Sequence, residues 1–237
     1  MEQTPKNRIK EFRRAARPGD SRFTAYKLST YAIAESTLEE ILLLSDALEA
    51  DNFTVANEVI EKNHKLGVMI RENANLSYHA VLEITNAMNH AQPQKDPLSV
   101  GAKFNPLVFA LSGIRITRCL EQMGNFSAHC AMLFRKKNIP KKIFVTDEKL
   151  NIILSRLVTS VGIAIEHFVE EKANTFGLIS KITHENREDC TSYFSSSMQK
   201  KRLKRKAFTD LSFTLHNFVN ISESAYIITK ESKTIFS

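Results

Sequence analysis

The sequence is poor in the residues that interrupt helices, and it contains no tryptophan. Its 237 residues include 7 glycines and 6 prolines, and β-branched runs bounded by turn residues are scarce. The prolines leave two long stretches, 19–92 and 141–237, in which helices can run without a break. These features predict an all-α fold.

Cysteine and long apolar runs are also in short supply. The 3 cysteines, Cys119, Cys130 and Cys190, make neither a disulfide framework nor a CxxC metal pair, which favours a reducing compartment. The first residues are basic without an apolar core, and no uninterrupted apolar run approaches the roughly 18 residues of a membrane span. We therefore expect a cytoplasmic protein.

Signatures of catalysis are missing from the sequence. The glycines are spread singly and form neither GxGxxG nor a Walker segment, and no serine or cysteine has a recognisable activating arrangement. Glu61 and His64 have the Glu-x-x-His spacing of di-iron bundles, but no second copy follows, so we interpret the pair as solvent-facing. The sequence does not predict an enzyme.

The clearest positive feature is a heptad pattern between residues 109 and 134. Its two interleaved series are Phe109, Ile116, Met123 and Cys130, and Ser112, Cys119, Phe126 and Leu133. Such a seam predicts a helix that lies along two partner helices in a bundle. Glu121 and Asn125 are four residues apart and are predicted to share the solvent-facing side opposite the seam. Gly124 falls at a b position outside the seam, where we expect it to let either a partner surface or a neighbouring helix approach the backbone.

A similar helix recurs 95 residues later. Ile116, Met123 and Cys130 map onto Leu211, Phe218 and Ala225, and Leu120, Asn125 and Ser127 recur as Leu215, Asn220 and Ser222. We interpret this match as a decayed duplication. The alternative is chance similarity between two amphipathic helices.

The helical stretches divide into two groups of three. Helices are predicted over 21–49, 54–90 and from Pro106 to about 134, and then over 147–172, 175–198 and 208–230. Breaks at 92–97, 135–142 and 200–206 combine proline or charge with polar residues. The predicted organisation is a basic tail at 1–22 and two tandem three-helix bundles at 23–136 and 145–232.

Positive charge is unevenly distributed. The net charge is +7, and residues 1–22 carry seven basic and three acidic groups. Lys200 to Lys206 holds six basic residues in seven. Both segments could attract an anionic lipid surface, nucleic acid or an acidic partner, or they could be solvated connections. Interleaved aromatic residues for base stacking are missing from Lys200 to Lys206, so no specific nucleic acid is predicted.

Leu120 to Asn125, followed by Ala128, His129 and the basic Arg135 to Lys137, resembles the Glu-Arg-Ile/Met-Gly-Asp signature of the PhoU family of phosphate-signalling regulators. The resemblance covers roughly residues 23–230. It implies two tandem three-helix bundles with the signature on the third helix of each. It also implies a non-enzymatic adaptor that docks on the ATPase of a phosphate ABC transporter and on a sensor histidine kinase, with possible homodimerisation and membrane contact through these partners.

The resemblance also implies metal sites built from carboxylates four residues apart, and here the motif is degenerate. Glu121 is retained, Asn125 replaces the family aspartate, and His216 and Asn220 stand at the second copy. An amide is a poorer ligand than a carboxylate for hard cations. We therefore predict docking through Glu121, Gly124 and Asn125 and no tightly bound cofactor. The alternative functions are a metal-binding helical-bundle protein and a basic nucleic-acid-binding helical protein.

Overall fold

The computed structural model describes residues 21–90, 105–172, 175–199 and 203–237. Throughout these ranges the regular structure is helical and no strand occurs, so the predicted all-α fold is confirmed. The helices are α2 (Arg22–Glu49), α3 (Phe53–His90), α4 (Pro106–Arg135), α5 (Ile143–Thr146), α6 (Glu148–Val169), α7 (Phe176–Gln199) and α8 (Arg205–Phe236).

Polar side chains cap the start of four of these helices. Ser21 accepts a hydrogen bond from Thr24 N at 3.2 Å, Asn52 caps α3, Asn105 caps α4 and Asp147 caps α6. These oxygens satisfy backbone N–H groups that have no partner within the helix. The predicted break at 92–97, residues 1–20 of the basic tail and residues 200–202 of the basic run lie outside the described residues.

The last helix is longer than predicted at both ends. The predicted range 208–230 is wrong because α8 begins at Arg205 and continues to Phe236. Arginine and lysine are good helix formers, so the charged start of α8 can be helical. At the other end, Glu231, Ser232 and Ile235 are buried against the rest of the bundle, which extends the helix beyond the heptad pattern.

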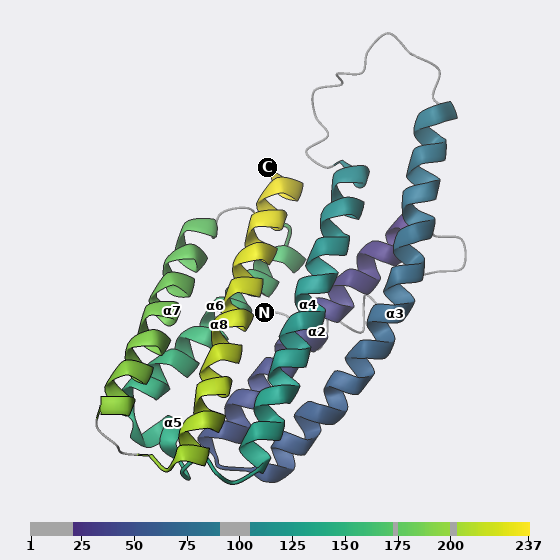
Figure 1. The fold of residues 1–237 in the computed structure, drawn as a ribbon. Helices are drawn as coiled ribbons and strands as arrows, with labels where there is room; N and C mark the ends of the chain where they lie inside the picture. The colour runs from purple at the N-terminus through teal and green to yellow at the C-terminus, as the bar shows by residue number, and fades with distance from the viewer. Residues whose placement is uncertain (1–20, 91–104, 173–174, 200–202) are drawn as a thin grey trace, which may run out of the picture.

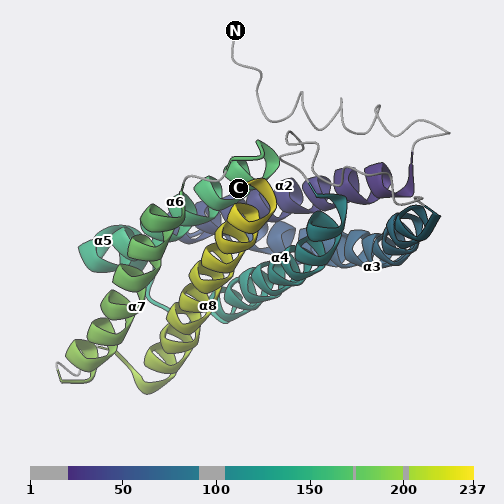
Figure 2. The same cartoon turned by 90° about the horizontal axis from the view of Figure 1, so that it is seen from above.

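The six long helices form two layers (Figures 1 and 2). α7, α8, α4 and α3 lie side by side in that order, and α6 and α2 cover one side of this row. The first half of the chain therefore contributes the three-helix group α2–α3–α4, and the second half contributes α6–α7–α8. The two groups meet where α4 packs along α8 and α2 packs along α6.

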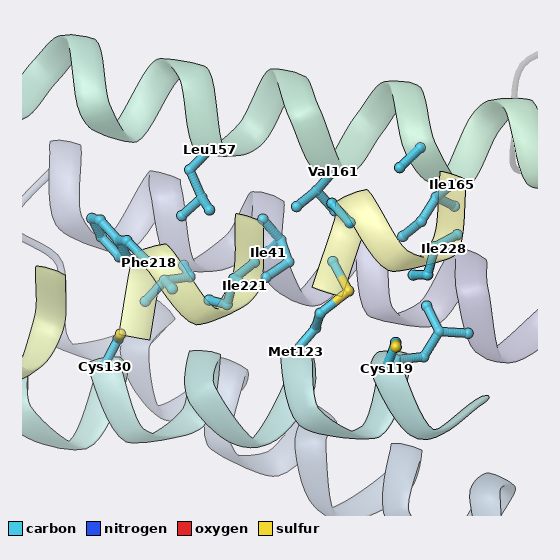
Figure 3. Packing of buried hydrophobic residues seen from close by; sticks show 14 of the residues in the cluster. Ile41, Cys119, Met123, Cys130, Leu157, Val161, Ile165, Phe218, Ile221 and Ile228 are labelled. Carbon is cyan, nitrogen blue, oxygen red and sulfur yellow. The ribbon is translucent and has the colours of Figure 1, made fainter. Parts of the chain in front are cut away.

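One continuous core joins the two groups. The seam residues Phe109, Ile116, Met123 and Cys130 are fully buried. Figure 3 shows Met123 and Cys130 of α4 on the side of Phe218 and Ile221 of α8, with Leu157 and Val161 of α6 closing the other side. The predicted seam is confirmed, although Phe126 is only partly buried.

A second junction lies where Phe168 of α6 meets the first group. Its ring centroid is 5.1 Å from that of Tyr31 and 6.3 Å from that of Phe109. Beside this cluster Tyr31 Oη donates to Glu171 Oε1 at 3.1 Å, and Lys27 Nζ lies 2.7 Å from the same oxygen. The predicted bundles at 23–136 and 145–232 thus share an interior, and the division of the chain into two domains at these bounds stays a prediction.

By length and composition, one helix in the described ranges, α6, could cross a membrane. Its apolar residues Leu150, Ile153, Leu157, Val161, Ile165 and Phe168 are buried in the bundle, where α6 packs against α2, α7 and α8. Its apolar composition is that of a helix at the centre of a bundle.

Candidate functional site

A groove of about 520 Å³ lies between α3 and α4. Its lining combines polar, charged and apolar side chains: Asn63, His64, Gly67, Val68, Ile70, Arg71, Glu121 and Asn125. Residues 63–71 span two turns of α3, and Glu121 and Asn125 are one turn apart on α4. The groove is therefore bounded by two rigid helices, which hold its polar groups at fixed spacing.

Glu121 and Asn125 occupy the position that the heptad predicts. Both are exposed and both line the groove, so their common solvent-facing side is confirmed. His216 and Asn220 lie on α8, away from the residues that line the groove. The structure thus brings one predicted pair to a site with α3 and leaves the other pair outside it.

The prediction that Gly124 lies on the open side of α4 is wrong, and of the two kinds of approach expected there, it is a neighbouring helix that comes close. Gly124 is buried, and a Cβ added to it would lie 2.6 Å from Leu66 Cδ2 and 2.8 Å from Asn63 Nδ2. The heptad seam assumes two neighbouring helices, but α4 packs against α2, α3 and α8. The buried side of α4 is therefore wider than the seam, and α3 covers the backbone at Gly124. An outside partner cannot approach there.

Glu40 of α2 packs against Gly124 from inside the bundle, and the sequence patterns above did not single it out. Its side chain has no exposed surface, and Oε2 would be 3.2 Å from a Cβ at Gly124. Neither carboxyl oxygen has a hydrogen-bond partner within the described part of the chain. Burial raises the pKa of Glu40 to about 8, although Lys62 and the Asn63 amide act in the opposite direction. The carboxyl group is therefore mainly protonated at neutral pH.

A signal for Glu40 does exist in the sequence. Ile33, Thr37 and Leu44 are buried on the same side of α2, and Glu40 falls between them at helical spacing. A glutamate within an apolar stripe is a candidate for burial. The neutral carboxyl group of Glu40 therefore lies beside Gly124 and Asn63. This places it directly behind the part of the groove wall that Asn63 forms.

The sequence matches no family model and no curated protein sequence. The crystal structure of PhoU from Pseudomonas aeruginosa, in contrast, is similar with a TM-score of 0.69 and 14% sequence identity. The match covers 90% of this chain and 96% of that chain. The chain has a PhoU-like fold. This is the fold that the resemblance at Leu120 to Asn125 implied, and that prediction is confirmed.

The groove does not suit the carboxylate-built metal sites that the sequence resemblance implies. Its potential ligands are one carboxylate, Glu121, one imidazole, His64, and the amides of Asn63 and Asn125. The guanidinium of Arg71 adds positive charge, which opposes a cation. No group of three or more histidine, cysteine, aspartate or glutamate side chains gathers within the described ranges. That the purified protein carries well under one tightly bound transition-metal ion per chain stays a prediction.

Proposed function

We propose that this chain is a cytoplasmic, non-enzymatic regulator of phosphate uptake and phosphate signalling that works by docking on other proteins. The observation that carries this proposal is the extent of the PhoU-like fold, which matches 90% of this chain and 96% of the PhoU chain. The likeness therefore extends over the overall architecture and is not confined to one short motif. The expected partners are a phosphate ABC transporter ATPase and a sensor histidine kinase.

The α3–α4 groove is the docking surface in this proposal. Glu121 and Arg71 offer charges of opposite sign, and Asn125 offers both a hydrogen-bond donor and an acceptor. Val68, 45% exposed, adds an apolar contact at the same place. Interfaces combine such apolar anchors with a polar rim. The groove can therefore select a partner through both charge and shape.

The test is a pull-down from phosphate-replete cells with wild-type protein and a Glu121→Lys, Asn125→Lys variant. We expect wild type to retain the transporter ATPase or the kinase. The amount of partner that the variant retains should be at least tenfold smaller, because the groove gains two positive charges. The matched control is Glu188→Lys, Thr191→Lys, which adds lysines at exposed positions on α7. Equal retention by wild type and the groove variant would reject the groove as the docking surface. Failure of wild type to retain either partner would contradict the proposed function.

A further inference from the structure

One end of the molecule gathers positive charge from two segments that are far apart in the sequence. The connection between α4 and α5 lies at this end together with the first turn of α8 (Figure 1). Asn138 Nδ2 donates to Asp210 Oδ2 at 2.7 Å and joins the two segments. The exposed cations here, which we call the basic end, are Arg135, Lys136, Lys137, Lys141, Lys142, Lys204, Arg205 and Lys206.

Most of the cations at the basic end are not paired with acidic side chains of the described part of the chain. Lys136 Nζ lies 3.7 Å from Asp210 Oδ1, and Lys137 Nζ lies 4.9 Å from the centroid of the Phe53 ring. The other cations of the basic end form no ion pair with the described part of the chain. The first turn of α8 contains no acidic residue, and its cap Lys204 makes no side-chain hydrogen bond. The partial positive charge of that helix end is therefore not offset.

The backbone of the α4–α5 connection has two lysines at positions where other residue types are favoured. Lys137 and Lys142 have φ angles of 57° and 56°, in the left-handed region where glycine or asparagine is favoured. A solvated turn with no further task would be better served by either residue. Lysine is present despite this backbone preference, which places two more ammonium groups at an already positive surface.

The apolar side chains at this end favour one class of anionic partner over another. Val145 of α5 follows Lys142 closely and is 50% exposed. No aromatic ring nearby is fully exposed for base stacking: Phe144 is buried, Lys137 lies over the half-buried Phe53, and the half-buried Phe208 packs edge-on against Phe194. Single-stranded nucleic acid needs such rings. A lipid surface instead needs clustered ammonium groups beside a small apolar contact.

We propose that the basic end is a docking surface for anionic phospholipid membranes, in which the lysine and arginine side chains contact lipid phosphates and Val145 enters the headgroup region. Lysine suits this task because its compact charge attracts phosphate groups without a fixed geometry. The α3–α4 groove runs along the side of the bundle, so contact through the basic end leaves it accessible. The proposal is independent of the identity of the docking partners.

The test is co-sedimentation of the full chain with vesicles. Vesicles of phosphatidylcholine alone are compared with vesicles that also contain phosphatidylglycerol, at low and at raised salt. We expect binding to the anionic vesicles only, and weaker binding at raised salt because the attraction is electrostatic. The variant Lys141→Gln, Lys142→Gln, Lys204→Gln, Lys206→Gln should bind at least tenfold more weakly, since each lysine contributes roughly fivefold.

A matched control removes the same charge elsewhere. Lys65→Gln, Lys181→Gln, Lys230→Gln, Lys233→Gln changes exposed lysines that lie outside the basic end and should bind as wild type does. Circular dichroism and a thermal melt establish that both variants are folded. Val145→Ser keeps every charge and should still reduce binding. The proposal is overturned if anionic vesicles do not bind the wild type, if both lysine variants lose binding equally, or if duplex DNA binds more tightly than vesicles at the same salt.

Discussion

Gly124 and Glu40 meet inside the first helical group, where α2, α3 and α4 come together. The glycine allows Leu66 and Asn63 to pack against the backbone of α4, and the carboxyl group of Glu40 lies on the α2 side of the same contact. The contact holds a fully buried acid whose two oxygens accept no hydrogen bond of regular geometry in the described ranges, with the Asn63 amide close by. Individual residues here set both the packing and the pH response of the wall behind the groove.

Gly124→Leu should lower the free energy of unfolding by about 3 kcal/mol or more, because even a Cβ would overlap Leu66 and Asn63. Urea denaturation followed by circular dichroism measures this change. The matched control is Gly162→Ala in α6, where an added Cβ meets nothing within 4 Å. That control should be neutral or up to about 1 kcal/mol more stable. A fully stable Gly124→Leu protein would show that α3 does not pack against Gly124.

Glu40 should make the protein less stable as the pH rises from 4.5 to 8. The carboxyl group titrates near 4.5 when unfolded and near 8 when folded. Between these values the native state keeps a proton that the unfolded state has lost, so stability is fully present below pH 4.5 and is lost as the pH rises through 8. The loss from this group is on the order of 4 kcal/mol.

The comparison of wild type with Glu40→Gln isolates this effect from other titrating groups. Denaturation at pH 5 and pH 8 should show the variant gaining stability relative to wild type by a few kcal/mol as the pH rises, because glutamine keeps the shape without the charge. A difference between the two proteins that is the same at both pH values would mean that Glu40 is ionised in the folded protein.

At the scale of the helices, periodicity and caps explain most of what the sequence could predict. The α2 cap at Ser21, the start of α4 at Pro106 and the α6 cap at Asp147 depend on neighbouring residues only, and such local rules locate helix ends. The open position of Glu121 and Asn125 also followed from helical spacing. Gly124 could not be placed in this way, because a heptad does not show that α4 has three neighbours. The partners of Glu121 and Asn125 on α3 likewise depend on tertiary packing.

Asp147 both caps α6 and bonds to α7, so replacing it should lower the free energy of unfolding by more than the loss of a helix cap alone. It accepts from Lys149 N at 3.1 Å and Leu150 N at 3.2 Å, and Tyr193 Oη of α7 donates to its other oxygen at 3.0 Å. Asp147→Ala should lower the free energy of unfolding by about 2 kcal/mol. Asp147→Asn retains a capping oxygen and should lose less than half as much, as measured by thermal denaturation. Equal losses would mean that charge, rather than hydrogen bonding, is what Asp147 supplies.

At the scale of the whole molecule, the shared core leads us to expect that the two helical groups unfold as one cooperative unit. Phe168 of α6 contacts Tyr31 and Phe109 of the first group and Phe236 of α8. Removing the side chain of a residue at such a junction removes packing contacts from both helical groups. The decayed duplication remains an interpretation, but the side-by-side placement of α4 and α8 puts the two related helices at the centre of the fold.

Phe168→Ala should therefore destabilise both groups together, by about 3 to 5 kcal/mol. Hydrogen exchange should show faster exchange in α4 and in α8 at once. Phe213→Ala on α8, where the ring is 52% exposed, is the matched control and should change stability by less than about 0.5 kcal/mol. Faster exchange confined to α6, α7 and α8 would show that the second group unfolds on its own.

The most direct test of the proposed regulatory function is a phosphate-responsive reporter in cells that lack this protein. The account predicts that the phosphate-starvation response is active in phosphate-rich medium and that wild-type protein represses it again. The Glu121→Lys, Asn125→Lys variant should fail to repress at equal protein level, whereas Glu188→Lys, Thr191→Lys should repress fully. A reporter that stays off in phosphate-rich medium without the protein would contradict the account.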